Sequence, residues 1–185
     1  MQEIVNIKKI SIWIFLIPFL AINLSLFIVT NSAEDSALFH QWVPYAGNVE
    51  TGVFPYIDGN ISISRAVRYF PTKFIFKPSM IITALLLINY WSKNRNLLYE
   101  LINENKNLNS MYYFGVSSAI CLIIHAIFLD INFDINLYKF FRRFVLISFI
   151  LFEIIAQAYF ISIFYKNLPK IKVLINEKVL FLKRI

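Results

Sequence analysis

Four long apolar segments limit what this chain can fold into. They cover residues 10–30, 78–92, 111–129 and 140–165, with Phe74–Phe76 extending the second. An α-helix rises about 1.5 Å per residue, so about 20 residues cross a hydrocarbon core of roughly 30 Å. The sequence therefore predicts an all-α, polytopic integral membrane protein with four transmembrane helices and one domain.

The composition agrees with a membrane protein. Hydrophobic residues make up 58% of the 185 residues, and the mean hydropathy of +0.62 is high for a soluble domain. The net charge of +7 comes from basic residues at the ends of the apolar segments. That position is typical of anchors at a membrane surface and argues against nucleic acid as a partner.

The chain carries no recognisable catalytic or metal-binding motif. Its single cysteine, Cys121, lies inside an apolar segment, which excludes a disulfide framework and a thiolate metal cluster. His40 and His125 lack metal-ligand or haem spacing, although the fold could bring them together. We expect no catalytic residues, no metal and no cofactor, and the sequence favours a protein that is not an enzyme.

The first apolar segment has two interpretations. Pro18 and Asn23 interrupt it, which a transmembrane helix tolerates where neighbours satisfy the freed backbone groups. The alternative is a signal peptide cleaved after Ala33. The segment is longer than the usual apolar region of a signal peptide, which favours the transmembrane helix.

A long polar loop over residues 31–77 follows, and it is the place where we expect specific activity. Ile and Ser alternate over residues 61–64. This pattern predicts a short extended segment or an amphipathic helix running to Tyr69 and stopped by Pro71. Pro78 is expected in the first turn of the second transmembrane helix, where its missing N–H is no loss.

The end of this loop carries a basic strip. Arg65, Arg68 and Lys73, together with Lys77, could bind a lipid phosphate at the outer membrane surface. Ser62 and Ser64 would supply hydrogen bonds to the same head group. The alternative is ordinary charge that is solvated or snorkels to water.

Loop charges predict the orientation. Basic residues at 8–9, in the polar connection 93–109 and in the tail 166–185 fall on one side of a four-helix protein. The positive-inside rule makes that side cytoplasmic, with both termini. The connection 93–109 is expected to contain a short surface helix. Arg142 and Arg143 lie on the outer side, against the rule, where Asp130 and Asp134 could offset them.

Polar residues inside the third and fourth segments form a second candidate site. Glu153 and Gln157 share one helix face near the middle of the bilayer, where a carboxyl is costly unless it is protonated or partnered. Ser117 and Ser118 are expected at a similar depth and could be its partners. His125 is expected near the outer interface. A role in substrate or proton handling and a purely structural hydrogen bond between helices both remain open.

Part of the sequence resembles a known family. The pattern consists of Pro55-Tyr56-Ile57, Ser62-Ile63-Ser64, Pro71, Phe74, Phe76 and Asn89-Tyr90-Trp91. Over about residues 10–91 it resembles the DRAM/FRAG/Sfk group of membrane proteins, which includes the PGAP-type proteins of GPI-lipid remodelling. The resemblance implies a lumenal or periplasmic loop and an association with lipid. Arg65 stands where the group commonly has an acidic residue, and the group commonly has six helices.

Three functions are therefore compatible with the sequence. The leading one is a lipid-associated membrane protein whose outer loop contacts a lipid head group or a partner. The second is a small proton-coupled transporter that uses Glu153 and Gln157. The third is a structural subunit of a membrane complex, with a protein partner or a second copy packed against its apolar faces.

Overall fold

A computed structural model describes residues 2–31, 56, 63–68, 70–102, 105–129, 131 and 136–167. Within these ranges the regular structure is helical, as predicted. Four helices are long and apolar enough to cross a membrane. The long helices are α1 (Gln2–Asn31), α4 (Thr72–Ile102), α5 (Asn105–Phe128) and α6 (Asn136–Lys166), and α3 is a short helix over Ile63–Ala66.

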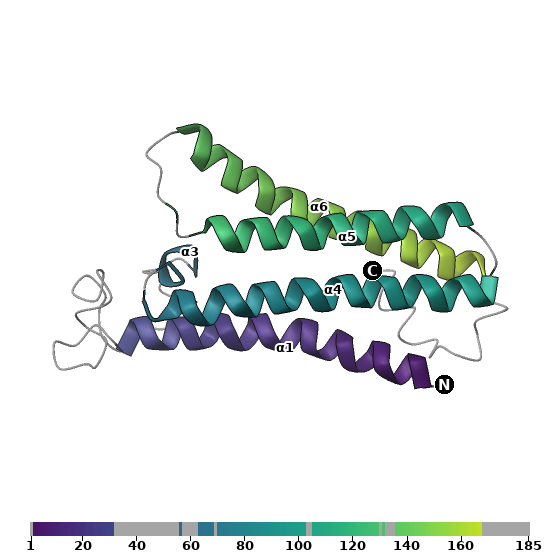
Figure 1. Ribbon diagram of the computed structural model, residues 1–185, viewed down its shortest axis with the longest axis horizontal. Coiled ribbons are helices and arrows are strands. Elements are labelled where there is room, and N and C mark those ends of the chain that lie inside the picture. The colour runs from purple at the N-terminus through teal and green to yellow at the C-terminus, as the bar shows by residue number, and fades with distance from the viewer. Residues whose placement is uncertain are drawn as a thin grey trace.

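The long helices pack in chain order. α1 packs against α4, α4 against α5 and α5 against α6, whereas α1 and α6 share no extensive contact within the described residues. Successive helices run in opposite directions, and α6 crosses α5 obliquely (Figure 1). The C-terminus of α1, the N-terminus of α4, the C-terminus of α5 and the N-terminus of α6 lie at the end where α3 is found. We call this the α3 end.

α4 is longer at both ends than the sequence predicted. It begins at Thr72, so Pro78 lies inside the helix instead of in its first turn. The hydroxyl of Thr72 donates to the backbone oxygen of Ala66, and the N–H of Phe74 donates to the oxygen of Pro71 at 3.0 Å. These bonds anchor an earlier start, and Pro78 costs only one hydrogen bond near the helix end.

The C-terminal end of α4 includes most of the polar connection 93–109. The expected separate surface helix within residues 93–109 is instead the continuation of α4 to Ile102 and the start of α5 at Asn105. Residues 93–109 contain neither Gly nor Pro to break a helix. Leu98 and Ile102 are buried, so packing extends α4 beyond its apolar segment.

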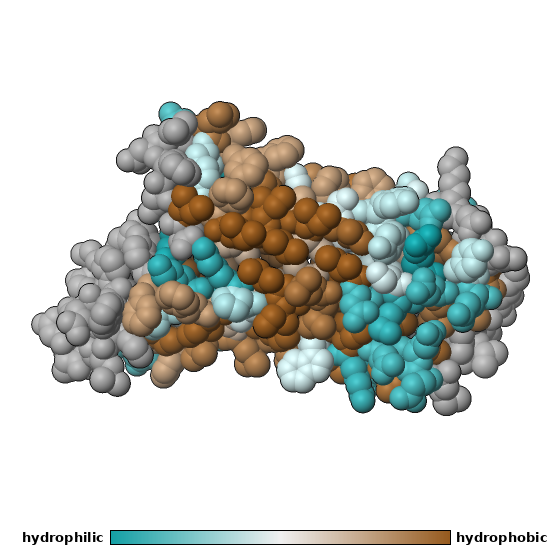
Figure 2. All heavy atoms as spheres, viewed as in Figure 1, coloured by the Kyte–Doolittle hydropathy of each residue, from teal (hydrophilic) through white to brown (hydrophobic). Residues whose placement is uncertain are grey.

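Small residues allow the helices to approach closely. Ala84, Ala119, Ala126 and Ala156 are fully buried on α4, α5 and α6. Large apolar side chains such as Phe15, Phe144 and Ile154 instead point outward. Figure 2 shows the result on one face, a hydrophobic band in the middle and polar residues toward the ends. This distribution is the one expected of helices surrounded by lipid.

Candidate functional site

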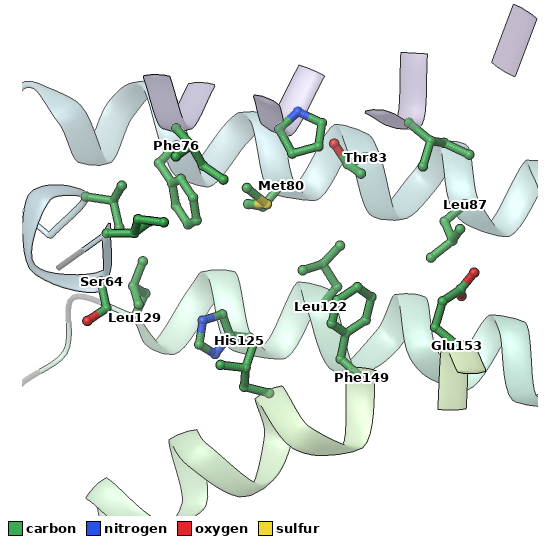
Figure 3. A pocket seen from close by; sticks show the side chains of 16 residues that line it. Ser64, Phe76, Met80, Thr83, Leu87, Leu122, His125, Leu129, Phe149 and Glu153 are labelled. Carbon is green, nitrogen blue, oxygen red and sulfur yellow. The ribbon is translucent and has the colours of Figure 1, made fainter. Parts of the chain in front are cut away.

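A cavity of about 490 Å³ lies between the four long helices. Residues of the short helix α3 also line it. Figure 3 shows Ser64 and Leu129 at one end of the cavity and Leu87 and Glu153 at the other. The lining is mainly apolar and includes Phe76, Met80, Leu87, Leu122, Leu129 and Phe149.

The cavity end nearest α3 is basic. His125 lines the cavity from α5, and the charge of Arg142, in the second turn of α6, acts both on His125 and on Arg68. Three nitrogens of this group are buried without a hydrogen-bond partner in the described structure: Nε of Arg68, Nδ1 of His125 and Nε of Arg142. We call these three residues the basic cluster. A buried donor or acceptor left unpaired is costly, and such a group is a candidate for ligand contact.

Contacts with the C-terminus of α5 position Arg142 of the basic cluster, and Lys77 also bonds there. The hydroxyl of Tyr138 donates to the backbone oxygen of Phe128 at 2.6 Å, and the guanidinium of Arg142 lies 5.9 Å from the centre of the Tyr138 ring. Lys77 donates to the backbone oxygen of Ile127 at 3.2 Å. Cations and hydroxyl donors are favourable at a helix C-terminus, where carbonyl groups lack partners within the helix. The α3 end therefore joins α4, α5 and α6.

The opposite end of the cavity is closed by a hydrogen-bonded group around Glu153. Its Oε2 accepts a hydrogen bond from Ser118 Oγ at 2.8 Å and a longer one from Trp91 Nε1 at 3.3 Å. Its Oε1 accepts from Gln157 Nε2 at 3.1 Å. Because Trp91, Ser118 and Glu153 belong to α4, α5 and α6, one carboxyl links three helices.

The hydroxyl of Ser118 has more acceptors than hydrogens. Its Oγ lies 2.8 Å from the backbone oxygen of Gly115 and 2.8 Å from Oε2 of Glu153. A hydroxyl donates one hydrogen. The one hydrogen of Ser118 is therefore shared between the backbone oxygen of Gly115 and Oε2 of Glu153.

The structure brings together some of the residues that the sequence singled out. Arg68 belongs to the basic cluster, Ser64 lines the cavity, and the Nζ of Lys73 lies 5.5 Å from the centre of the Phe74 ring. Ser62, the side chain of Arg65 and His40 lie outside the described residues. Of the two structures expected here, an extended segment or a helix, the chain forms a helix, but it covers only Ile63–Ala66 and ends before the expected Tyr69.

The second candidate site forms around one of its two expected serines. Ser118 bonds Glu153 and is fully buried, whereas Ser117 makes no hydrogen bond to this carboxyl. Gln157 contacts Glu153, as their spacing predicted. His125 lies at the α3 end, the end that the sequence assigned to the outer side.

Two residues of these sites were missed by the sequence analysis. Arg142 was noted only as an exception to the charge rule, and Trp91 only as part of the pattern that resembles the DRAM/FRAG/Sfk group. Each carried a usable signal. An Arg just inside an apolar segment requires a partner or access to water, and a buried indole N–H requires an acceptor.

Comparison with known proteins gives no relative: no protein-family model, no curated protein and no solved structure matches this chain. The resemblance to the DRAM/FRAG/Sfk group therefore stays a prediction from the sequence.

Proposed function

We propose that this protein is an integral membrane protein that binds the head group of an anionic lipid at its α3 end. The observation that supports the proposal most is the basic cluster, which reaches the apolar cavity through His125. In this proposal both termini are cytoplasmic, so the α3 end lies at the outer surface of the membrane.

Charge is the first argument for an anionic ligand. Arg68 and Arg142 are close enough for their charges to interact, and like charges repel. The carboxylates within the described ranges, Glu3, Glu100 and Glu153, lie away from the α3 end, and Asp130 and Asp134, in the connection between α5 and α6, lie outside those ranges. An anion between the guanidinium groups would replace this repulsion with two attractions, and a phosphate matches the fork of N–H donors on arginine.

Burial is the second argument. Arg68 and Arg142 are both partly exposed, and the Nε atom of each is buried without a hydrogen-bond partner in the described structure. A head-group oxygen would give these donors acceptors, and the apolar cavity beside them would accommodate the hydrophobic part of a lipid. This combination favours lipid binding over ordinary solvated charge.

Co-purified lipid tests the proposal. The wild-type protein and the double variant Arg68→Ala/Arg142→Ala are purified in mild detergent from the same membrane, and bound phospholipid is extracted and quantified. Arg143→Ala is the matched control, because Arg143 is the exposed neighbour of Arg142. We expect wild type and control to retain anionic phospholipid and the double variant to lose it. Equal retention in all three proteins would refute the proposal.

A proton-coupled carrier is the second candidate function. It is favoured by one observation: Glu153 both lines the cavity and holds the hydrogen bonds that join three helices. Gain or loss of a proton there would change contacts that reach α4 and α5. In that case Glu153→Gln abolishes proton-coupled uptake into vesicles, while retention of lipid at the basic cluster survives.

A further inference from the structure

We infer that the cavity holds one acyl chain of a phospholipid from the leaflet at the α3 end, and that the layer containing Trp91 and Glu153 limits the length of that chain. The inference rests on the proposed function, because the basic cluster holds the head group. It adds the chemical class of the ligand, an anionic glycerophospholipid, and the part of the protein that selects its chain.

The depth of the cavity matches one leaflet. On α4 the lining extends over 11 residues, from Phe76 to Leu87, and on α6 it extends from Leu146 to Glu153, with Arg142 one turn before Leu146. At about 1.5 Å per residue this is roughly 16 Å. Half of a hydrocarbon core of about 30 Å is roughly 15 Å. With the head group at Arg142, a chain lying along α6 would end beside Glu153.

The cavity has room for an acyl chain along its length, with a volume of about 490 Å³ and a mainly apolar lining. The second chain of the lipid would remain in the bilayer, because α1 and α6 are not packed together along the cavity.

Fully packed side chains close the cavity beyond Leu87. Trp91 lies one turn further along α4, is fully buried, and contacts the ring of Phe160 edge to face at 6.1 Å between ring centres. Its indole nitrogen is 3.3 Å from Oε2 of Glu153. The chain terminus would therefore meet Trp91 and Glu153, whereas the carbon atoms near the head group would lie beside Phe76 and Leu129.

Fluorescence quenching of Trp91 measures where the chain ends. The full-length protein carrying Trp13→Phe and Trp42→Phe keeps Trp91 as its one tryptophan. It is reconstituted in zwitterionic vesicles with a small fraction of phosphatidylglycerol brominated either near the chain terminus or near the carbonyl group. We expect the terminal bromine to quench Trp91 and the bromine near the carbonyl group to quench it far less. Adding Arg68→Ala/Arg142→Ala should remove the difference.

The outcomes separate this inference from the proposed function. Lipid retention without quenching of Trp91, or equal quenching by both lipids, would leave the head-group site standing and overturn the chain in the cavity. Absence of retained phospholipid from the wild-type protein would refute both. Quenching that survives in the double arginine variant would overturn the assignment of the head group to the basic cluster.

A second variant tests the limit on chain length. Leu87→Phe fills the inner end of the cavity, and Leu85→Phe is the matched control because Leu85 points outward with 57% of its surface exposed. We expect Leu87→Phe to shift the retained phospholipids toward shorter chains and Leu85→Phe to leave them unchanged. If the wild-type protein, Leu87→Phe and Leu85→Phe retained phospholipids with the same chain lengths, Trp91 and Glu153 would not limit the length of the chain.

Discussion

The indole ring of Trp91 occupies the space that a side chain at Gly115 would need. A Cβ added at Gly115 would overlap the five-membered ring of the indole, so glycine is required for α4 and α5 to approach at this level. The same indole donates a hydrogen bond to Glu153 on α6. The contact between Trp91 and Gly115 therefore positions the carboxyl that closes the cavity.

Gly115→Ala is expected to destabilise the protein. The added methyl group forces the Trp91 ring to move, and overpacking of this kind costs about 1–3 kcal/mol. The measurement is the temperature at which the detergent-solubilised protein loses its monodisperse peak on size-exclusion chromatography. Val116→Ala, at the next position on α5, is the comparison for a general effect of substitution. Equal transition temperatures for wild type and Gly115→Ala would contradict the packing described here.

Ser118→Ala is expected to weaken the link between α5 and α6. It removes the hydroxyl 2.8 Å from Glu153, and hydrogen bonds between transmembrane helices contribute about 0.6 kcal/mol on average. Ser117→Ala is the matched control, because Ser117 is adjacent and does not bond this carboxyl. Titration with a denaturing detergent should give a lower midpoint for Ser118→Ala alone. Identical shifts for the two serine variants would contradict the assignment.

Glu153→Gln is expected to preserve most of the stability that Glu153→Leu loses. A glutamine amide can donate to Ser118 and accept from Trp91 or Gln157, whereas leucine leaves those polar groups unpaired. The detergent titration used for the serine variants measures both. Lipid retention should survive Glu153→Gln because the basic cluster is untouched. A Gln variant as unstable as the Leu variant would show that hydrogen bonding is not what position 153 contributes.

The sequence predicted the four apolar helices and only parts of the sites. Hydropathy identifies apolar segments directly, but the ends of α4 depend on the bond from Thr72 to Ala66 and on burial of Ile102. The position of a residue along its helix predicts its depth in the bilayer, and this was enough to predict that Ser118 could contact Glu153. Depth does not show which way a helix is rotated about its axis. The sequence could therefore not show which of Ser117 and Ser118 faces Glu153. Arg68 and Arg142 are 74 positions apart, and only the fold brings them together.

Cysteine labelling tests the proposed orientation. In a Cys121→Ser background, Lys139→Cys places a thiol on an exposed site at the α3 end, and Lys9→Cys places one on an exposed site at the opposite end. A membrane-impermeant maleimide added to intact cells should label the variant at position 139 and should label that at position 9 only after permeabilisation. The reverse pattern would place the α3 end in the cytoplasm.

Native mass spectrometry of the intact protein tests the central claim most directly. Equal amounts of an anionic and a zwitterionic phospholipid with the same chains are added to delipidated protein in mild detergent, and the bound species are counted. The account predicts one tightly held anionic lipid on the wild-type protein and on Arg143→Ala, and none on Arg68→Ala/Arg142→Ala. Binding of variable numbers of both lipids, with the same distribution in the wild-type protein and in Arg68→Ala/Arg142→Ala, would contradict a specific anionic-lipid site.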